Sequence, residues 1–188
     1  MSYCTFVATA PDSDRKALHK KYHDHQYGFP IHDDNELFGR LIMEINQAGL
    51  SWETILKKED SFRKAYDQFS IENIAAYTET DRERLLNDAG IIRNKLKVNA
   101  AIVNAQAILE LKTEFGSFKH WLDHHHPKSK DEWVKLFKKT FKFTGGEIVN
   151  EFLMSTGYLP GAHDADCPIH KEILKKEPKR KSHRIQEK

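Results

Sequence analysis

The sequence contains few cysteines and no long apolar run near its start. Among 188 residues it has two cysteines, Cys4 and Cys167, one near each end. In a reducing compartment such a pair does not form a structural disulfide, so we expect free thiols or metal ligands. The first residues, "MSYCTFVATAPDSDRK", have no basic start and no long apolar run. We therefore expect no signal peptide, no membrane-spanning segment and a cytoplasmic location.

The sequence also lacks alternating strand patterns and internal repeats. Its hydrophobic fraction of 39% and charged fraction of 31% are typical of a soluble globular protein. The length predicts a single domain, placed at residues 1–170, that can bury a core without disulfides. Residues 171–188 carry eight Lys or Arg against three Glu. We expect this basic tail to be frayed, and binding to nucleic acid is the alternative.

Helical periodicity dominates the sequence. In "NELFGRLIMEINQAGLSW" the apolar residues follow a spacing of three to four, which predicts a helix over about 35–48 with one buried face. On this helix Glu44 falls at the edge of the apolar face, while Met43 points the opposite way. Gly49 stands where a helix would end.

Further patterns predict more helices and together indicate an all-α bundle of about eight short helices. In one of them Thr80 and Glu83 form a predicted capping box. The longest helix should bury one face that carries Leu96, Ala100, Val103, Ala107 and Leu111. The segment "DHHHPKSKDEW" reads as a loop before a short helix. Besides this short helix, the predicted helices cover about 51–57, 61–68, 70–77, 80–90, 94–115 and 146–157.

One group of residues has the composition of a metal site. His163 and Cys167 stand four residues apart in "HDADC", so that one turn can aim both side chains at one ion. Cys4 and His23 can complete a set of two sulfurs and two nitrogens, which suits a tetrahedral structural zinc. The alternative is unrelated surface histidines and two buried thiols.

Glu44 is a second candidate, because it lies at the edge of an apolar helix face with Trp52 eight residues further on. A half-buried carboxylate beside an aromatic ring suits a flat ligand that is cationic or carries an amine. The alternative is a carboxylate that reaches past the core to solvent.

The segment "DAGIIRNKLK" is the third candidate. A helix ending at Gly90, a tight turn and a helix start with Arg93, Lys95 and Lys97 would present backbone N–H groups and positive charge to a phosphate. An ordinary corner between two helices with solvated lysines is the alternative.

Four segments together resemble the 3-methyladenine DNA glycosylase I family of the helix-hairpin-helix DNA glycosylase superfamily. They are "YHDHQYG", "MEINQAGLSWETILKK", "DAGIIRNKLK" and "HDADC", and they occur in the order of the family. The resemblance runs from Cys4 to Cys167, and "QAGLSW" followed by "TILKK" is its most specific part. It implies an all-α fold with a helix-hairpin-helix near residues 80–100.

The resemblance implies an enzyme that flips N3-methyladenine out of alkylated double-stranded DNA and hydrolyses its N-glycosidic bond, and we expect a monomer. The resemblance implies that Glu44, Tyr22 and Trp52 form the base pocket and that the turn at Gly90 binds the DNA backbone. It also implies a structural zinc that ties the N-terminal and C-terminal segments together. The zinc ligands would be Cys4, His23, His163 and Cys167. Asp24 is expected to orient His23, or alternatively to position the attacking water.

Some positions depart from the pattern of the family. Tyr27 and Phe6 stand where the family has tryptophans, and Glu147 replaces a small hydroxyl residue in "TGGEI". Two alternatives to the predicted activity therefore stay open. One is a module that binds DNA or a lesion without cleaving it. The other is a glycosylase for a different alkylated base, such as N3-methylguanine.

Overall fold

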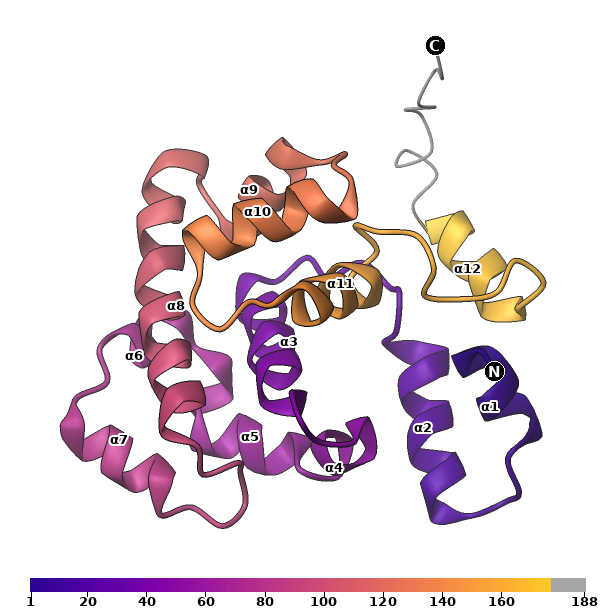
Figure 1. Ribbon diagram of the computed structural model, residues 1–188, viewed down its shortest axis with the longest axis horizontal. Helices are drawn as coiled ribbons and strands as arrows, with labels where there is room; N and C mark the ends of the chain where they lie inside the picture. The colour runs from indigo at the N-terminus through magenta and orange to yellow at the C-terminus, as the bar shows by residue number, and fades with distance from the viewer. Residues whose placement is uncertain (177–188) are drawn as a thin grey trace. The chain divides into compact units, whose positions relative to one another are not determined.

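The computed structural model describes residues 1–176, and the statements of structure below concern this part of the chain. It contains twelve α-helices, one 3-10 helix (η1) and no strand, which confirms the predicted all-α class (Figure 1). The elements are α1 (Tyr3–Thr9), α2 (Asp14–His25), α3 (Asp34–Gln47), α4 (Trp52–Lys57), α5 (Glu59–Ala65), η1 (Asp67–Phe69), α6 (Ile71–Ala75), α7 (Glu79–Leu86), α8 (Lys95–Phe115), α9 (Phe118–His125), α10 (Lys130–Thr140), α11 (Gly146–Ser155) and α12 (Pro168–Lys176). None of these helices is long and apolar enough to cross a membrane.

The chain divides into two compact units. The first combines Met1–Pro30 with the chain from Leu153 onward, and it contains α1, α2 and α12. The second is Ile31–Phe152, which contains α3 to α10 and most of α11. The predicted single domain over residues 1–170 stays a prediction. Of the predicted tail, residues 171–176 belong to α12 and the rest lies outside the described residues.

Helix α3 is the buried centre of the second unit. Every side chain from Leu37 to Asn46 is buried, so the prediction of a single buried face is wrong. Met43, predicted to point away from the core, is only 3% exposed. Because other elements cover this part of α3 on all sides, Arg40, Glu44 and Asn46 are buried together with its apolar residues.

A carboxylate at the start of α3 also begins another helix. Both oxygens of Asp34 accept hydrogen bonds from α9, from Phe118 N and Lys119 N at 2.9 Å each. These two N–H groups belong to the first turn of α9, where no partner exists within the helix. The residue that helps to cap α9 therefore lies more than eighty positions away in the sequence.

The sequence located most helices of the second unit and missed others. The helices predicted near 35–48, 51–57 and 94–115 are confirmed as α3, α4 and α8. The count of about eight is too low, because α1, α2, α9 and α12 were not predicted. The capping box lies two residues before its predicted place, at Thr78 and Asp81, where Thr78 N donates to the Asp81 carboxylate at 2.9 Å.

Helix α8 buries a face that shares only Ala100 with the five residues predicted to be buried. Leu96 is 67% exposed and Val103 is 39% exposed, whereas Val98, Ile102 and Ile108 are buried. Alanines lie on several sides of this helix, so the apolar pattern alone did not decide which face is covered.

A glycine makes the close packing of α3 against η1 possible. Residues 67–69 all have positive φ angles of 48–60°, and this turn presses the Phe69 ring onto α3 at Gly39. A Cβ atom added at Gly39 would lie 2.3 Å from Cδ2 of Phe69. Since Phe69 is buried, its ring has no free space into which to move.

We therefore expect Gly39→Ala to destabilise the fold by about 1–3 kcal/mol, the usual cost of overpacking a core. The intrinsic helix propensity of alanine would by itself stabilise α3 by about 1 kcal/mol, so the sign of the change is informative. Denaturant unfolding measures the effect. Gly145→Ala is the matched control, because nothing lies within 4 Å of a Cβ atom there. A Gly39→Ala protein as stable as this control would contradict the packing argument.

Candidate functional site

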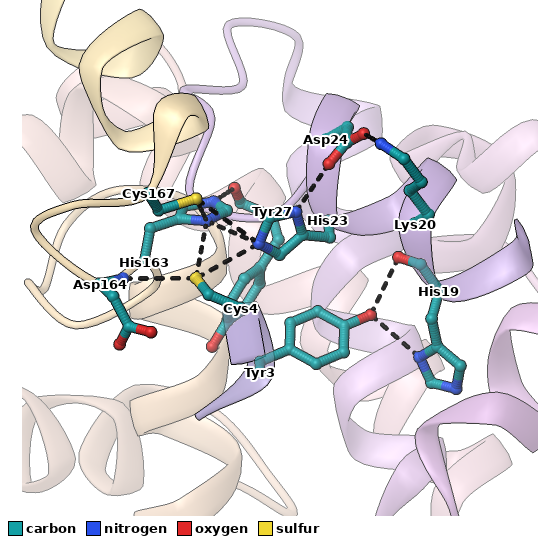
Figure 2. A network of polar contacts seen from close by, with 10 residues as sticks. All are labelled: Tyr3, Cys4, His19, Lys20, His23, Asp24, Tyr27, His163, Asp164 and Cys167. Atoms are coloured by element: carbon teal, nitrogen blue, oxygen red, sulfur yellow. Dashed lines mark hydrogen bonds and ion pairs between the residues drawn. The ribbon is translucent and has the colours of Figure 1, made fainter. Parts of the chain in front are cut away.

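Four side chains of the first unit converge on one point, as predicted from the sequence. Cys4 lies in the first turn of α1 and His23 in the last turn of α2, while His163 and Cys167 come from the segment before α12. One potential ligand atom from each residue lies within 4.8 Å of all the others. Figure 2 shows the two imidazole rings and the two sulfur atoms pointing toward one another.

The helices that carry two of these ligands begin at serine caps. Ser2 accepts a hydrogen bond from Thr5 N at the start of α1, and Ser13 accepts one from Lys16 N at the start of α2. Such caps satisfy N–H groups that have no partner within the helix. They therefore help to define where Cys4 and His23 lie on their helices.

The distances within the cluster fit a tetrahedral zinc ion. With Zn–S bonds of about 2.3 Å and Zn–N bonds of about 2.0–2.1 Å, a tetrahedron separates two nitrogens by about 3.3 Å and a nitrogen from a sulfur by about 3.6 Å. His23 Nε2 and His163 Nδ1 lie 3.2 Å apart. The four N···S distances are 3.3, 3.6, 3.8 and 3.9 Å. The four atoms thus already surround a space of the size that one ion requires.

The outward-facing nitrogens of both imidazoles are engaged by other groups. Nδ1 of His23 lies 2.7 Å from Asp24 Oδ1, and Nε2 of His163 lies 2.7 Å from the carbonyl oxygen of Tyr27. Because these oxygens accept a hydrogen bond from a ring N–H, the other nitrogen of each neutral ring is left with a lone pair for a metal. The predicted orienting role of Asp24 toward His23 is therefore supported by its geometry. The Tyr27 carbonyl was not predicted, since a main-chain acceptor leaves no sequence signal.

A glycine brings the loop after α2 close to the second histidine. Gly28 has a φ angle of 79° and donates its N–H to the carbonyl of Ser155 at 2.8 Å. A Cβ atom on Gly28 would lie 2.9 Å from Ala162 Cβ and 3.2 Å from His163 Cδ2. The glycine in "YGFP" thus permits both the turn and the contact with His163.

Burial affects the proton affinities of the cluster. Burial lowers the pKa of the His163 imidazole, which favours the neutral, metal-binding form. For Cys4, burial is the main influence and raises the thiol pKa to about 11, although Asp164 N donates to its sulfur at 3.3 Å. A metal must therefore displace a proton from Cys4, and its affinity should increase with pH.

Asp24 remains ionised beside the cluster. Partial burial raises its pKa, but hydrogen bonds from Lys20 and His23 outweigh this effect and lower the pKa overall. A negative charge next to His23 strengthens the imidazole as a metal ligand.

The residues assigned to a base pocket lie in both units. Tyr22 is buried on α2 in the first unit. Glu44 on α3 and Trp52, the first residue of α4, lie in the second unit. A tight turn joins α3 to α4, in which Gly49 has a φ angle of 81° and Leu50 N donates to Gln47 O at 2.7 Å. The assembly of these three residues into one pocket stays a prediction.

Glu44 is a carboxyl group in an unfavourable environment for its charge. Its side chain is buried, with 4% of the residue exposed, and burial raises the pKa to about 8. Arg40, one turn earlier on α3, lowers the pKa, and Glu151 raises it further. Such a shift of a buried carboxyl group is typical of functional sites, and Arg40 is a neighbour that sequence analysis missed.

The predicted DNA-backbone residues differ in their environments. Arg93 and Lys95 are exposed in and directly after the turn that joins α7 to α8. Gly90 lies in the same turn, where its N–H donates to Asp88 Oδ1 at 2.7 Å. Lys97 is only 5% exposed, and its ammonium donates to main-chain carbonyls of Asn46 and Ala48. Its charge is thus engaged within the protein.

Comparisons with known proteins give one consistent answer. Residues 12–133 match the sequence model of a family described as methyladenine glycosylase. The chain is 35% identical to DNA-3-methyladenine glycosylase 1 of Escherichia coli over 186 residues, which covers 89% of this chain and 96% of the relative. It is 33% identical to DNA-3-methyladenine glycosylase of Haemophilus influenzae, over 81% of this chain and 92% of the relative.

A solved structure agrees with these sequence matches. A substituted 3-methyladenine DNA glycosylase I in complex with 3-methyladenine matches this fold with a TM-score of 0.77 and 31% identity. The match covers 90% of this chain and 97% of that chain. The similarity therefore extends over nearly the whole length of both proteins.

The raised pKa of Glu44 predicts how stability depends on pH. Between the ordinary carboxyl pKa of about 4.5 and the folded value of about 8, the folded protein holds a proton that the unfolded chain has released. The free energy of unfolding should therefore decrease as the pH rises through this window. Glu44→Gln removes the ionisable group and should flatten the decrease, leaving the variant more stable than the wild type at pH 9.

Thermal unfolding at a series of pH values between 5 and 9 tests this expectation. Glu110→Gln, an exposed carboxamide substitution on α8, is the control and should follow the wild-type profile. A Glu44→Gln protein with the same pH profile as the wild type would show that Glu44 is ionised in the folded state at neutral pH.

Proposed function

Because the chain belongs to the methyladenine glycosylase family, we propose that it excises N3-methyladenine from alkylated DNA by hydrolysing the N-glycosidic bond. The similarity over nearly its full length to DNA-3-methyladenine glycosylases is the observation that carries this conclusion. The chain is thus a hydrolase of base-excision repair. We further propose that it acts as a monomer in the cytoplasm.

The chemistry of the damaged base explains why this site needs little acid catalysis. Methylation at N3 gives the adenine a positive charge, so the base is already a good leaving group. What the protein must supply is extraction and recognition of the base. Flipping costs a few kcal/mol, less for a damaged base, and stacking and edge contacts in a pocket must offset this cost.

We assign the recognition of the base to Glu44, Tyr22 and Trp52. Glu44 accepts a hydrogen bond from the amino group of the base and balances its charge, Tyr22 adds a polar contact, and Trp52 stacks. The raised pKa of Glu44 supports this assignment, because a cation that enters beside a buried carboxyl group favours its ionised form. Recognition of a charged base thereby becomes coupled to the loss of a proton from Glu44.

The bond is broken by water attack on the sugar carbon as positive charge develops there, as in glycoside hydrolysis generally. An ionised Glu44 near the flipped nucleotide also favours this cationic transition state by electrostatic attraction.

For the DNA backbone we propose a helix-hairpin-helix formed by α7, the turn over residues 87–94, and α8. Exposed Arg93 and Lys95 supply positive charge, and the turn at Gly90 brings the main chain close to a phosphate. Because Lys97 is buried, we restrict the phosphate contacts to Gly90, Arg93 and Lys95.

For the cluster in the first unit we propose a structural zinc ion, held by Cys4, His23, His163 and Cys167. The donor set of two thiolates and two imidazoles and the spacing of its atoms support this choice. A bound zinc would cross-link α1 and α2 to the segment before α12. With four protein ligands it has no open position for catalysis.

Release of methyladenine tests the proposed activity. Incubation with methylated double-stranded DNA should release free N3-methyladenine, measured by chromatography under single-turnover conditions. Glu44→Gln keeps an acceptor oxygen but loses the charge, and a charged hydrogen bond contributes about 1.5–3 kcal/mol, so we expect a rate about 10- to 100-fold lower. Glu110→Gln should retain the wild-type rate. If the wild type binds methylated DNA and releases no base, the protein is a binding module instead.

Metal analysis tests the zinc site. The purified protein should contain about one equivalent of zinc, and Cys167→Ser should lose both the metal and thermal stability. Asp24→Asn should retain zinc but bind it about 10- to 100-fold more weakly, measured by competition with a chromophoric chelator. Asp166→Asn, an exposed neighbour of Cys167, is the control. A wild-type protein that contains no zinc and keeps its melting temperature in the presence of a chelator would overturn this assignment.

A further inference from the structure

Two lysines connect the segment that carries Glu44 and Trp52 to the turn between α7 and α8. Lys97, in the first turn of α8, donates its ammonium to Asn46 O at 2.8 Å and to Ala48 O at 2.7 Å. In the opposite direction, Lys58 at the end of α4 donates to Ala89 O at 3.1 Å and to Gly90 O at 3.3 Å. All these residues belong to the second unit.

Lys97 provides hydrogen-bond donors for the carbonyl groups at the C-terminal end of α3. The last carbonyl groups of a helix have no partner within it and carry a partial negative charge. Asn46 and Ala48 lie at this end of α3, and the buried ammonium of Lys97 occupies both of their oxygens. Burial lowers the pKa of this ammonium, so the protein tolerates a cost for placing it there. A lysine on the surface of α8 would avoid that cost.

These contacts fix the segment between Glu44 and Trp52, two of the three proposed pocket residues. Glu44 lies one turn before the end of α3, and Trp52 begins α4 after the tight turn at Gly49. Ser51 caps α4 by accepting a hydrogen bond from Thr54 N at 3.2 Å. Lys97 anchors the first half of this connection at Asn46 and Ala48, and Lys58 anchors the far end of α4.

The turn between α7 and α8 is also packed closely against α5. A Cβ atom on Gly90 would lie 3.1 Å from Ser61 Cβ and 3.0 Å from Asp88 Oδ1. Because the acceptors of both lysines are main-chain carbonyls, the contacts depend on where the backbone lies and not on the rotamer of a second side chain. Movement of the turn would therefore displace the ends of α3 and α4.

We propose that Lys58 and Lys97 form a brace that sets the position of Glu44 and Trp52 relative to the DNA-binding turn. The proposal rests on the function proposed above. The two lysines are positioning residues: they touch neither base nor phosphate, and they act through the segment that carries Glu44 and Trp52. Binding of the turn to the DNA backbone thereby places Glu44 and Trp52 where a flipped base can reach them.

Loss of the brace should impair base release and spare DNA binding. In Lys97→Met and Lys58→Met the single-turnover rate of methyladenine release at saturating methylated DNA should fall about 10- to 100-fold, since small misplacements of a reacting group have effects of this size. Affinity for undamaged duplex DNA, and its dependence on salt, should stay close to the wild type, because Arg93 and Lys95 remain. The rate of the double variant should fall by less than the product of the two single reductions, because both lysines stabilise the same arrangement of α3, α4 and the turn.

Matched controls separate positioning from general stability. Lys112→Met removes a lysine from the other end of α8, where it pairs with Glu72, and should keep the wild-type rate. Lys58→Arg should restore most of the rate, because a guanidinium can donate to two carbonyls and Lys58 is only half-buried. Thermal unfolding of each variant shows whether a loss of rate merely follows a loss of stability.

The outcomes distinguish the brace from the activity on which it rests. An inactive wild type would refute the proposed function. If the wild type is active and both Met variants fold and keep its rate, the brace is refuted while the function stands. A loss of rate matched by an equal loss of DNA affinity would also refute the brace, because it would place the lysines at the phosphates.

Discussion

The burial of α3 from Leu37 to Asn46 is the constraint on which the second unit depends. A helix segment covered on all sides has no solvent-facing position for its polar groups, so each of them must be accommodated by the surrounding elements. Asp34 is engaged by the start of α9, the last carbonyls by Lys97, and Gly39 leaves the space that the Phe69 ring occupies. Glu44 is the carboxyl group for which burial instead raises the pKa to about 8.

This arrangement explains how one helix serves both the fold and the proposed chemistry. A carboxyl group that is costly to ionise in the free protein responds strongly to a cation that enters beside it, because the same low polarity strengthens the attraction. Burying Glu44 costs free energy of folding. Part of this cost is recovered when a positively charged base binds beside the carboxyl group. A solvated carboxylate on the surface would offer neither effect.

The metal cluster shows which features of a site can be predicted from a sequence and which cannot. The residue types and the spacing of His163 and Cys167 indicated a possible ion site that Cys4 and His23 could complete, and the family resemblance pointed to the same four residues. The sequence contained no sign of the Tyr27 carbonyl or of the glycine that lets its loop reach His163. Main-chain acceptors and close backbone approaches depend on the path of the chain in space, which residue types alone do not specify.

Much of the helical content was predictable from the sequence, because apolar spacing and capping residues are local signals. This held for α3, α4 and α8. Helix α9 was not predicted although Ser117 caps it locally by accepting a hydrogen bond from His120 N, and Asp34 on another helix adds two capping bonds that leave no local signal. The buried face of α8 was predicted correctly only at Ala100, since alanines around the helix made its local pattern ambiguous.

The sequence by itself determined the all-α class, most helices of the second unit, the four residues of the metal cluster and the family resemblance. Only the tertiary structure decided that Lys97 lies inside the protein, that α3 is covered on every side from Leu37 to Asn46, and that the Tyr27 carbonyl orients His163. The physical reason is that propensity and spacing act between neighbours along the chain. Burial and the partner of a charged group depend instead on segments that come together only when the chain folds.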